Sequence, residues 1–391
     1  MNPRRSFGVC AFITMAAMSG CNKAATGLEL PVREVALQRQ LPMAVVLDQT
    51  ATGRVFATSI PVGDPADLAG RVLRISQGEI KSAAIEGGIP FSIDTSPVVD
   101  GRMRLAVGVG GVERPLDFNY SSNEPTVFQP LGRISIVDGD TLAQLDEIET
   151  QWSVIEVAFS PDGTQLVAVG ASGVRQLFVG FWSWPSLEKL SEHSCAAGLP
   201  QFPFRSPVKV SAFASSGSNL LVSIRMSELL PPSHAKANGG LLVLECKSGK
   251  QVGSVKIDRV CTFLDHSDRT SLLTCASESN CSLFKLDLAN CATQEFETRL
   301  LNTHYGALVP FEAEDRLLAV KHEVGSGSRR VANVDVLVRT RRDPDNNIWQ
   351  TQETLFDESI QHRNICLSMS GEEREFALGT SDGRVIVWKV D

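Results

Sequence analysis

The chain has 391 residues, a formal net charge of −8 and a charged fraction of 21%. Hydrophobic residues make up 43% of it, which fits a globular body with a sizeable core. Residues 1–20 hold two arginines and no acidic residue, so the rest of the chain is more acidic than the whole. This acidity argues against nucleic acid as a general partner.

The first 20 residues have the organisation of an export signal. Two arginines precede a mostly apolar run, residues 6–18, that is too short to cross a bilayer as a stable helix. Small residues then precede Cys21. This order resembles the lipobox of bacterial lipoproteins, and the resemblance implies cleavage before Cys21 and acylation of its thiol and its new amine. We therefore predict a signal peptide over 1–20 and a lipid-anchored tether over 21–34.

The residue after the predicted anchor bears on localisation. Asn22 follows Cys21, whereas an aspartate there would favour retention at the inner membrane in enteric-type sorting. We expect the outer membrane, with the folded body facing the periplasm. An ordinary secreted protein with a chance cysteine is the alternative.

From residue 35 onward, short β-prone runs alternate with turn residues. Residues 35–47 (VALQRQLPMAVVL) come first, and apolar runs follow at 105–107 and 134–137. The clearest unit spans 154–182, where VIEVAFS, LVAV and LFVGFW predict three antiparallel strands. The first two are separated by Ser-Pro-Asp-Gly at 160–163, in which proline presets φ and glycine tolerates positive φ. That tetrapeptide is interpreted as a turn, not as a reactive loop.

The same unit recurs along the chain. Phe159 ends the first strand of the clearest unit, and a large apolar residue returns in the same place at intervals of about fifty residues. These counterparts are Phe213, Phe263, Phe311 and Leu367. Third-strand runs follow at 241–244, 283–286, 334–338 and 385–388. Units of this length with three or four short strands indicate a β-propeller.

Two stretches resemble WD repeats. SDGRVIVWK at 381–389 is similar to the end of such a repeat, and FSPDG at 159–163 is similar to the first turn of bacterial WD-like repeats. We predict an all-β propeller over 35–391 with seven blades of four-stranded antiparallel sheets, six or eight being the alternatives. The last unit stops after its third strand, so residues 35–47 are expected to supply the fourth and close the ring.

Cysteine usage allows disulfides in an exported protein. Seven cysteines remain beyond Cys21, and five of them lie within 246–291. Cys275 and Cys281 flank a short turn, so a cross-strand bridge between them is one hypothesis and buried free thiols are the other. The odd number leaves at least one thiol free. No CxxC pair is present in the sequence, which gives a zinc ribbon or a thioredoxin-like site no support.

Motifs for catalysis or cofactor binding are scarce. The six histidines show no HExxH spacing, and no GxSxG elbow occurs. The acidic stretch at 343–347 lacks the later residues of a calcium loop and is interpreted as a hairpin tip. We predict no cofactor and no metal.

Long inserts between strands are the candidate binding elements. The inserts at 185–207 and 227–240 carry apolar residues that could anchor a partner or cover the sheet edge: Phe202, Phe204, Leu229 and Leu230. A predicted hairpin over 331–349 carries a basic cluster that could meet an acidic partner or lipid phosphate, or form a solvated face: Arg339, Arg341 and Arg342.

Two functional hypotheses follow. The first is a non-catalytic protein-binding scaffold anchored in the cell envelope, with an unidentified protein partner and an immunity-type role as a narrower variant. Its architecture resembles that of the propeller lipoprotein of the outer-membrane barrel-assembly machinery. The second is a periplasmic propeller enzyme of hydrolase, lyase or quinoprotein type, with a site in the axial channel assembled from several blades.

Overall fold

The structure is a computed structural model of the whole chain. It describes residues between 33 and 389, with side chains described mainly within 34–194 and 375–388. Outside the description lie residues 1–32 and the segments 38–39, 48–53, 62–69, 77–78, 112–128, 161, 174–175, 195–208, 214–218, 228–236, 246–250, 258–259, 268–269, 277–280, 288–291, 301–304, 312–315, 325–329, 341–347, 361–365, 370–374, 381 and 390–391.

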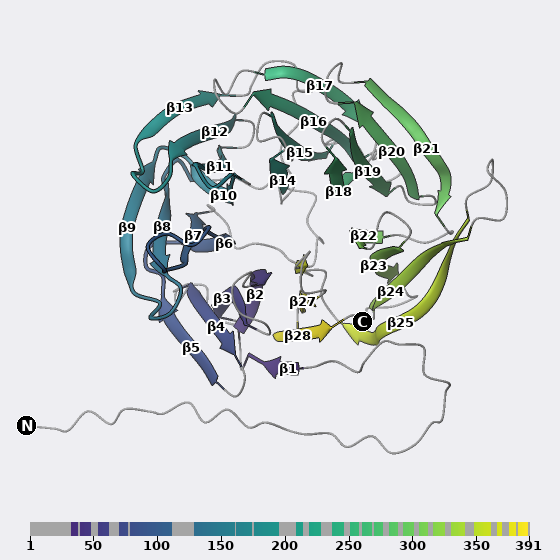
Figure 1. Cartoon of the computed structure of the whole chain (residues 1–391), viewed down its shortest axis with the longest axis horizontal. Coiled ribbons are helices and arrows are strands. Elements are labelled where there is room, and N and C mark those ends of the chain that lie inside the picture. The colour runs from purple at the N-terminus through teal and green to yellow at the C-terminus, as the bar shows by residue number, and fades with distance from the viewer. Residues whose placement is uncertain are drawn as a thin grey trace, which may run out of the picture.

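The described residues form seven four-stranded antiparallel sheets arranged in a ring (Figure 1). We number these sheets as blades 1 to 7 in chain order. Blades 1 to 3 contain β2 (Gln40–Leu47), β3 (Val55–Pro61), β4 (Arg71–Ser76), β5 (Glu79–Ala84); β6 (Ile89–Thr95), β7 (Arg104–Gly110), β8 (Gly132–Asp138), β9 (Gln144–Thr150); and β10 (Ser153–Phe159), β11 (Gln165–Ser172), β12 (Gln176–Ser183), β13 (Lys189–Ser194). In blades 1 to 6 the first strand lies nearest the centre of the ring (Figure 1).

The remaining blades repeat this arrangement. Blades 4 to 6 contain β14 (Lys209–Phe213), β15 (Asn219–Ser227), β16 (Ala237–Glu245), β17 (Gln251–Ile257); β18 (Val260–Ser267), β19 (Thr270–Ala276), β20 (Cys281–Asp287), β21 (Ala292–Leu300); and β22 (Tyr305–Phe311), β23 (Arg316–Val324), β24 (Arg330–Thr340), β25 (Ile348–Ile360). Blade 7 is composite, with β26 (Cys366–Met369), β27 (Glu375–Gly379) and β28 (Arg384–Lys389) from one end of the chain and β1 (Arg33–Ala36) from the other.

The all-β propeller prediction is confirmed, and the seven sheets match the predicted blade number. The large apolar residues used to align the repeats lie on the innermost strands, and the predicted third-strand runs lie on β8, β12, β16, β20, β24 and β28. The closure prediction needs one correction. The stretch 35–47 splits, because its beginning belongs to β1, which completes blade 7, whereas residues 40–47 form β2, the inner strand of blade 1.

The ring is closed by a short antiparallel pairing. Val35 lies opposite Val385 in register, and the backbone N–H of Leu37 donates to the carbonyl of Gly383 at 2.6 Å. Arg384 lies 3.2 Å from the carboxylate of Glu34 on β1. Leu37, directly after β1, is buried together with apolar residues of blades 1 and 7, and Val35 of β1 packs against the same cluster. The segment 35–37 therefore adds to the core as well as to the hydrogen-bond ladder.

The core lies between blades. β3, β7 and β11 are buried at nearly every position, whereas the outermost β5 and β9 are mostly exposed. Both faces of a middle strand are covered by neighbouring blades, which explains why these strands are continuous apolar runs. The cluster between blades 2 and 3 contains Trp152, Trp182 and Trp184, so these three indoles pack between blades.

The Ser-Pro-Asp-Gly stretch is a turn, as predicted. The hydroxyl of Ser160 accepts the backbone N–H groups of Thr164 and Gln165 at 3.1 and 2.9 Å and donates to Asp162 at 2.6 Å. This hydrogen bond from Ser160, with that from the Thr164 backbone, holds the pKa of Asp162 below its ordinary value although burial opposes it. The same design recurs in blade 7, where Thr380 donates to Asp382 and accepts from the Arg384 N–H.

Removing β1 should open the ring. We compare deletion of residues 2–37 with deletion of residues 2–32, which leaves β1 in place. The longer deletion exposes the edge of β28 and removes Leu37 from the core, so we expect a lower melting temperature and faster proteolysis for it alone. Circular dichroism melting and limited proteolysis measure this. Equal stability of the two deletions would show that β1 is dispensable for closure.

Glycine 163 should be harder to replace than a glycine of similar backbone conformation. Gly163 and Gly173 have φ of +68° and +63°, which costs an L-residue roughly 1–2 kcal/mol. A Cβ on Gly163 would lie 2.6 Å from Cγ of Pro97, whereas one on Gly173 meets nothing within 4 Å. We expect Gly163→Ala to lower the free energy of unfolding more than Gly173→Ala in urea titrations. Equal losses would mean that the contact with Pro97 relaxes freely.

Candidate interaction surface

The alternation of antiparallel strands assigns every connection to one of the two ends of the ring. Connections from a blade's first to second strand, and from its third to fourth, lie at one end, which we call the short-turn end. Connections from second to third strand, and those between blades, lie at the other, which we call the long-connection end. This assignment depends only on the strand order.

The longest connections gather at one end. They are residues 62–70, 111–131, 195–208 and 228–236, and each joins strands that meet at the long-connection end. The turns at the short-turn end, such as 160–164 and 139–143, are tight and internally hydrogen-bonded. The two ends of the ring therefore differ in the amount of chain that departs from the rigid scaffold.

The base of the longest connection is held by a buried serine of the next blade. Ser153, the first residue of β10, is fully buried. Its hydroxyl accepts the N–H of Gly111 at 3.0 Å and lies 2.8 Å from the carbonyl of Gln129, to which it donates. The N–H of Gln129 donates to the Gly111 carbonyl at 2.9 Å, which brings both ends of the connection together. Residues 112–128 thus depart from a fixed base.

Apolar residues lie beside this base. Leu41, Ile60 and Ile89 form a small buried cluster at the long-connection end, and the half-buried Met43 and Phe91 pack against it. The last two sit at irregularities in the ladders of β2 and β6, where the register shifts between Pro42 and Ala44 and between Pro90 and Ser92. Such bulges reorient a side chain relative to the sheet. The innermost strands thereby present apolar side chains at this end.

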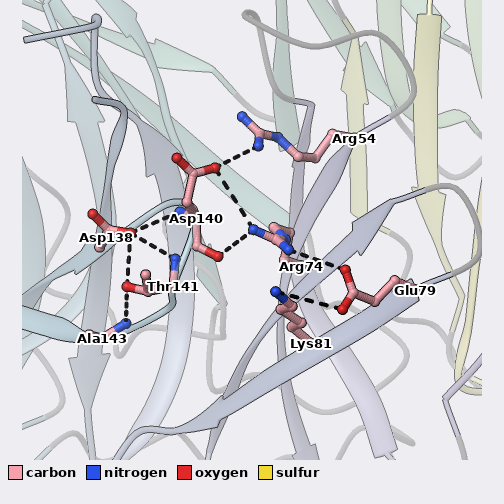
Figure 2. A network of polar contacts seen from close by, with 8 residues as sticks. All are labelled: Arg54, Arg74, Glu79, Lys81, Asp138, Asp140, Thr141 and Ala143. Carbon is pink, nitrogen blue, oxygen red and sulfur yellow. Dashed lines mark hydrogen bonds and ion pairs between the residues drawn. The ribbon is translucent and has the colours of Figure 1, made fainter. Parts of the chain in front are cut away.

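An ion-pair network at the short-turn end joins blade 1 to blade 2 (Figure 2). Arg74 on β4 has a side chain that is 10% exposed, and it donates to the carbonyl of Asp140 in the β8–β9 turn. Arg54 lies 2.9 Å from the Asp140 carboxylate, and Arg74 lies 3.4 Å from Glu79, which also faces Lys81. The three cationic groups all face carboxylates, so the network fastens neighbouring blades to each other.

Asp138 shapes the turn that carries Asp140. One carboxylate oxygen accepts the N–H groups of Asp140 and Thr141 at 3.0 and 2.7 Å, and the Thr141 hydroxyl at 2.9 Å (Figure 2). Burial raises the pKa of Asp138, but these hydrogen bonds and the nearby Arg102 outweigh it and hold the pKa below its ordinary value. The carboxylate is a structural acceptor.

Asp94 is the described acid whose protonation is most altered. It lies on β6, and its carboxylate accepts the N–H of Phe159 on blade 3 at 2.7 Å and that of Thr95 at 2.9 Å. Burial raises its pKa to about 6, against the lowering effect of these two backbone hydrogen bonds. Phe159 in turn packs edge-on against Trp184 at 4.8 Å. Asp94 is thus an inter-blade acceptor that titrates near neutral pH.

Among the residues that the structure describes, no group of three or more histidine, cysteine, aspartate or glutamate side chains could hold a metal ion. In the described part of the chain, none of the helices is both long and apolar enough to span a bilayer.

The predicted apolar anchors lie in two segments whose flanking strands are described. Phe202, Phe204, Leu229 and Leu230 lie outside the described residues, in segments 195–208 and 228–236. The strands before and after these segments all meet at the long-connection end. The exposure and the contacts of the four apolar residues therefore stay predictions.

The predicted basic cluster belongs to the opposite end. Arg339 lies on β24 opposite Trp349 of β25, so the predicted long hairpin is present. Arg341 and Arg342 lie outside the described residues, directly after the end of β24 at the short-turn end. The strands that flank 341–347 therefore meet at the opposite end of the ring from the strands that flank 195–208 and 228–236.

The predicted cysteine sites are placed only in part. Cys21 lies outside the described residues, so its acylation stays a prediction. Cys275 on β19 is opposite Ser282, and Cys281 on β20 is opposite Ala276, so the two cysteines are not register partners.

The sequence alone predicted no role for Asp94 or Ser153. An acid inside the strand FSIDT was a signal for the first, whereas nothing local marked the second.

The fold defines the chain as a β-propeller of seven four-stranded sheets. Among solved structures, 1057 chains match it. One belongs to the structure titled "Crystal Structure of Mitotic Checkpoint Complex", with a TM-score of 0.59 over 98% of this chain and 99% of that chain, at 12% identity. At this identity the similarity concerns the fold alone. No protein-family model matches the chain, and no curated protein matches it in sequence.

The raised pKa of Asp94 predicts a pH dependence. The folded state holds the proton up to about pH 6, whereas the unfolded aspartate releases it near its ordinary value of 3.8. Between these two values the folded state binds more protons, so this group makes stability fall as pH rises through the window. Asp94→Asn does not titrate, so the parent should gain stability relative to this variant as pH falls from 6.5 to about 4.5.

Melting temperatures measured across that range give the test. Asp146→Asn, at an exposed position on β9, is the matched control and should follow the parent in parallel. If the curves of the parent and Asp94→Asn also ran in parallel, Asp94 would not be titrating in this window.

Proposed function

We propose that this chain is a non-catalytic protein-binding scaffold, anchored in the bacterial cell envelope through acylated Cys21 and facing the periplasm from the outer membrane. The observation that carries the proposal is the gathering of the longest connections at one end of a rigid ring. A rigid scaffold that presents loops on one face is a common arrangement for binding. The partner is expected to contact the long-connection end.

The composition of the innermost strands supports a scaffold. Within the described residues, the innermost strands carry few acidic side chains and few lysine or histidine side chains: Asp94, Glu156, Lys209, Asp265 and His266. An enzyme with an axial site would gather such groups from several blades into one constellation. Asp94 itself is occupied by two backbone N–H groups.

The anchoring part of the proposal rests on the order of charged, apolar and small residues before Cys21. Two or three acyl chains give stable membrane attachment because each buried methylene contributes roughly 0.8 kcal/mol. The short segment between Cys21 and β1 would keep the ring close to the bilayer. In this proposal β1 both closes the ring and connects the ring to the tether.

A comparison of the two ends tests the binding surface. The full chain carrying Phe202→Ser and Phe204→Ser is compared with one carrying Arg341→Ala and Arg342→Ala, which alters the opposite end. After crosslinking in cells and mass spectrometry, we expect the partner recovered with the parent to be lost by the first variant and kept by the second. No reproducible partner, or loss in the second variant alone, would contradict the proposal.

Anchoring is tested separately by Cys21→Ser. This variant should leave the membrane fraction, and the circular dichroism of the folded body should stay unchanged. Retention in the outer-membrane fraction would refute acylation of Cys21 without affecting the binding surface.

A further inference from the structure

Blade 5 brings two cysteines into direct register. Cys261 on β18 lies opposite Cys275 on β19 in an antiparallel pair, between the matched pairs Val260 with Ala276 and Thr262 with Thr274. Directly opposed residues in such a ladder have Cα atoms about 4.5–5.5 Å apart. Disulfides require Cα separations of about 4.4–6.8 Å. The register therefore places these two positions within disulfide range without movement of the backbone.

No other cysteines on the described strands are paired in this way. Cys281 is opposite Ala276 on one side and Leu300 on the other, and Cys366 is opposite Gly379. Cys275 shares its register position with Ser282, one residue away from Cys281. Successive residues of a strand belong to opposite faces of the sheet. Cys275 and Cys281 therefore occupy opposite faces, whereas Cys261 and Cys275 share one.

We propose that Cys261 and Cys275 form a disulfide that joins the innermost strand of blade 5 to its second strand. The oxidant is a small-molecule or protein disulfide, of the kind that an exported chain meets. The thiolate of one cysteine attacks the oxidant disulfide and releases one thiol. The second thiolate then attacks the mixed disulfide and releases the other. One S–S bond forms, the oxidant is reduced to two thiols, and these take up the two protons.

The bond would constrain the unfolded chain. It closes residues 261–275, which include the β18–β19 hairpin except its terminal pair Val260 and Ala276, and such a link removes conformations from the unfolded ensemble. The folded register already supplies the geometry, so the native strands need not shift. The inference goes beyond the binding role proposed above, and its chemistry can be tested without a partner or a membrane.

Peptide mapping distinguishes the candidate pairs. The purified full chain in detergent solution is reduced, equilibrated with reduced and oxidised glutathione, blocked with iodoacetamide and digested with trypsin without reduction. Trypsin releases residues 260–269, with Cys261, and residues 270–285, with both Cys275 and Cys281. A second digestion after Glu278 separates the last two cysteines. We expect residues 260–269 to remain joined to residues 270–278.

Other linkages would overturn the proposal. Recovery of residues 260–269 with a blocked, unlinked Cys261 would do so, as would residues 270–278 joined to 279–285, the Cys275–Cys281 bridge. Among variants, Cys281→Ser should keep the expected link and Cys275→Ser should free Cys261. The map of the parent chain decides the question even if a variant fails to fold. Because oxidation is carried out on the purified chain, failure of the proposed export or of the scaffold role leaves this result independent.

Discussion

The whole ring depends on one non-covalent junction. The first described strand, β1, pairs with β28 from the other end of the chain, and without it blade 7 would have three strands and an open edge. Every other pair of neighbouring strands within a blade is consecutive in the chain and directly joined by a connecting segment. The inter-blade core needs a neighbour on both faces of each sheet, so an open seventh blade would uncover apolar surface on the first as well.

Apolar contacts and polar contacts hold neighbouring blades together at different places along the strands. Large aromatic and branched side chains fill the space between the middle strands, and Trp152, Trp182 and Trp388 are almost completely buried. At the ends of the strands, where backbone groups would otherwise meet water, side chains such as Asp94, Asp138 and Ser160 accept N–H groups. Acids and serines that resemble reactive groups in the sequence are therefore occupied by the backbone.

The two ends of the ring have consequently different characters. The short-turn end is made of tight turns and paired charges, as in the network around Arg74 and Asp140 (Figure 2). The long-connection end carries the extended connections and, beside them, the half-buried Met43 and Phe91. Ser153 hydrogen-bonds to Gly111 and Gln129, so the base of one such connection is held by the next blade. This asymmetry is the physical basis for the proposed binding face.

Local patterns were sufficient to predict the repeats. Alternating and continuous apolar runs, separated by Gly, Pro and Asp, placed the inner and third strands because a blade is built from contiguous chain. The turn at 160–163 and the hairpin around Arg339 were predicted for the same reason. Relations between distant residues needed the tertiary structure. The division of 35–47 between two blades, the pairing of Cys261 with Cys275, and the burial of Asp94 against Phe159 depend on register and on the neighbouring blade, which no local sequence encodes.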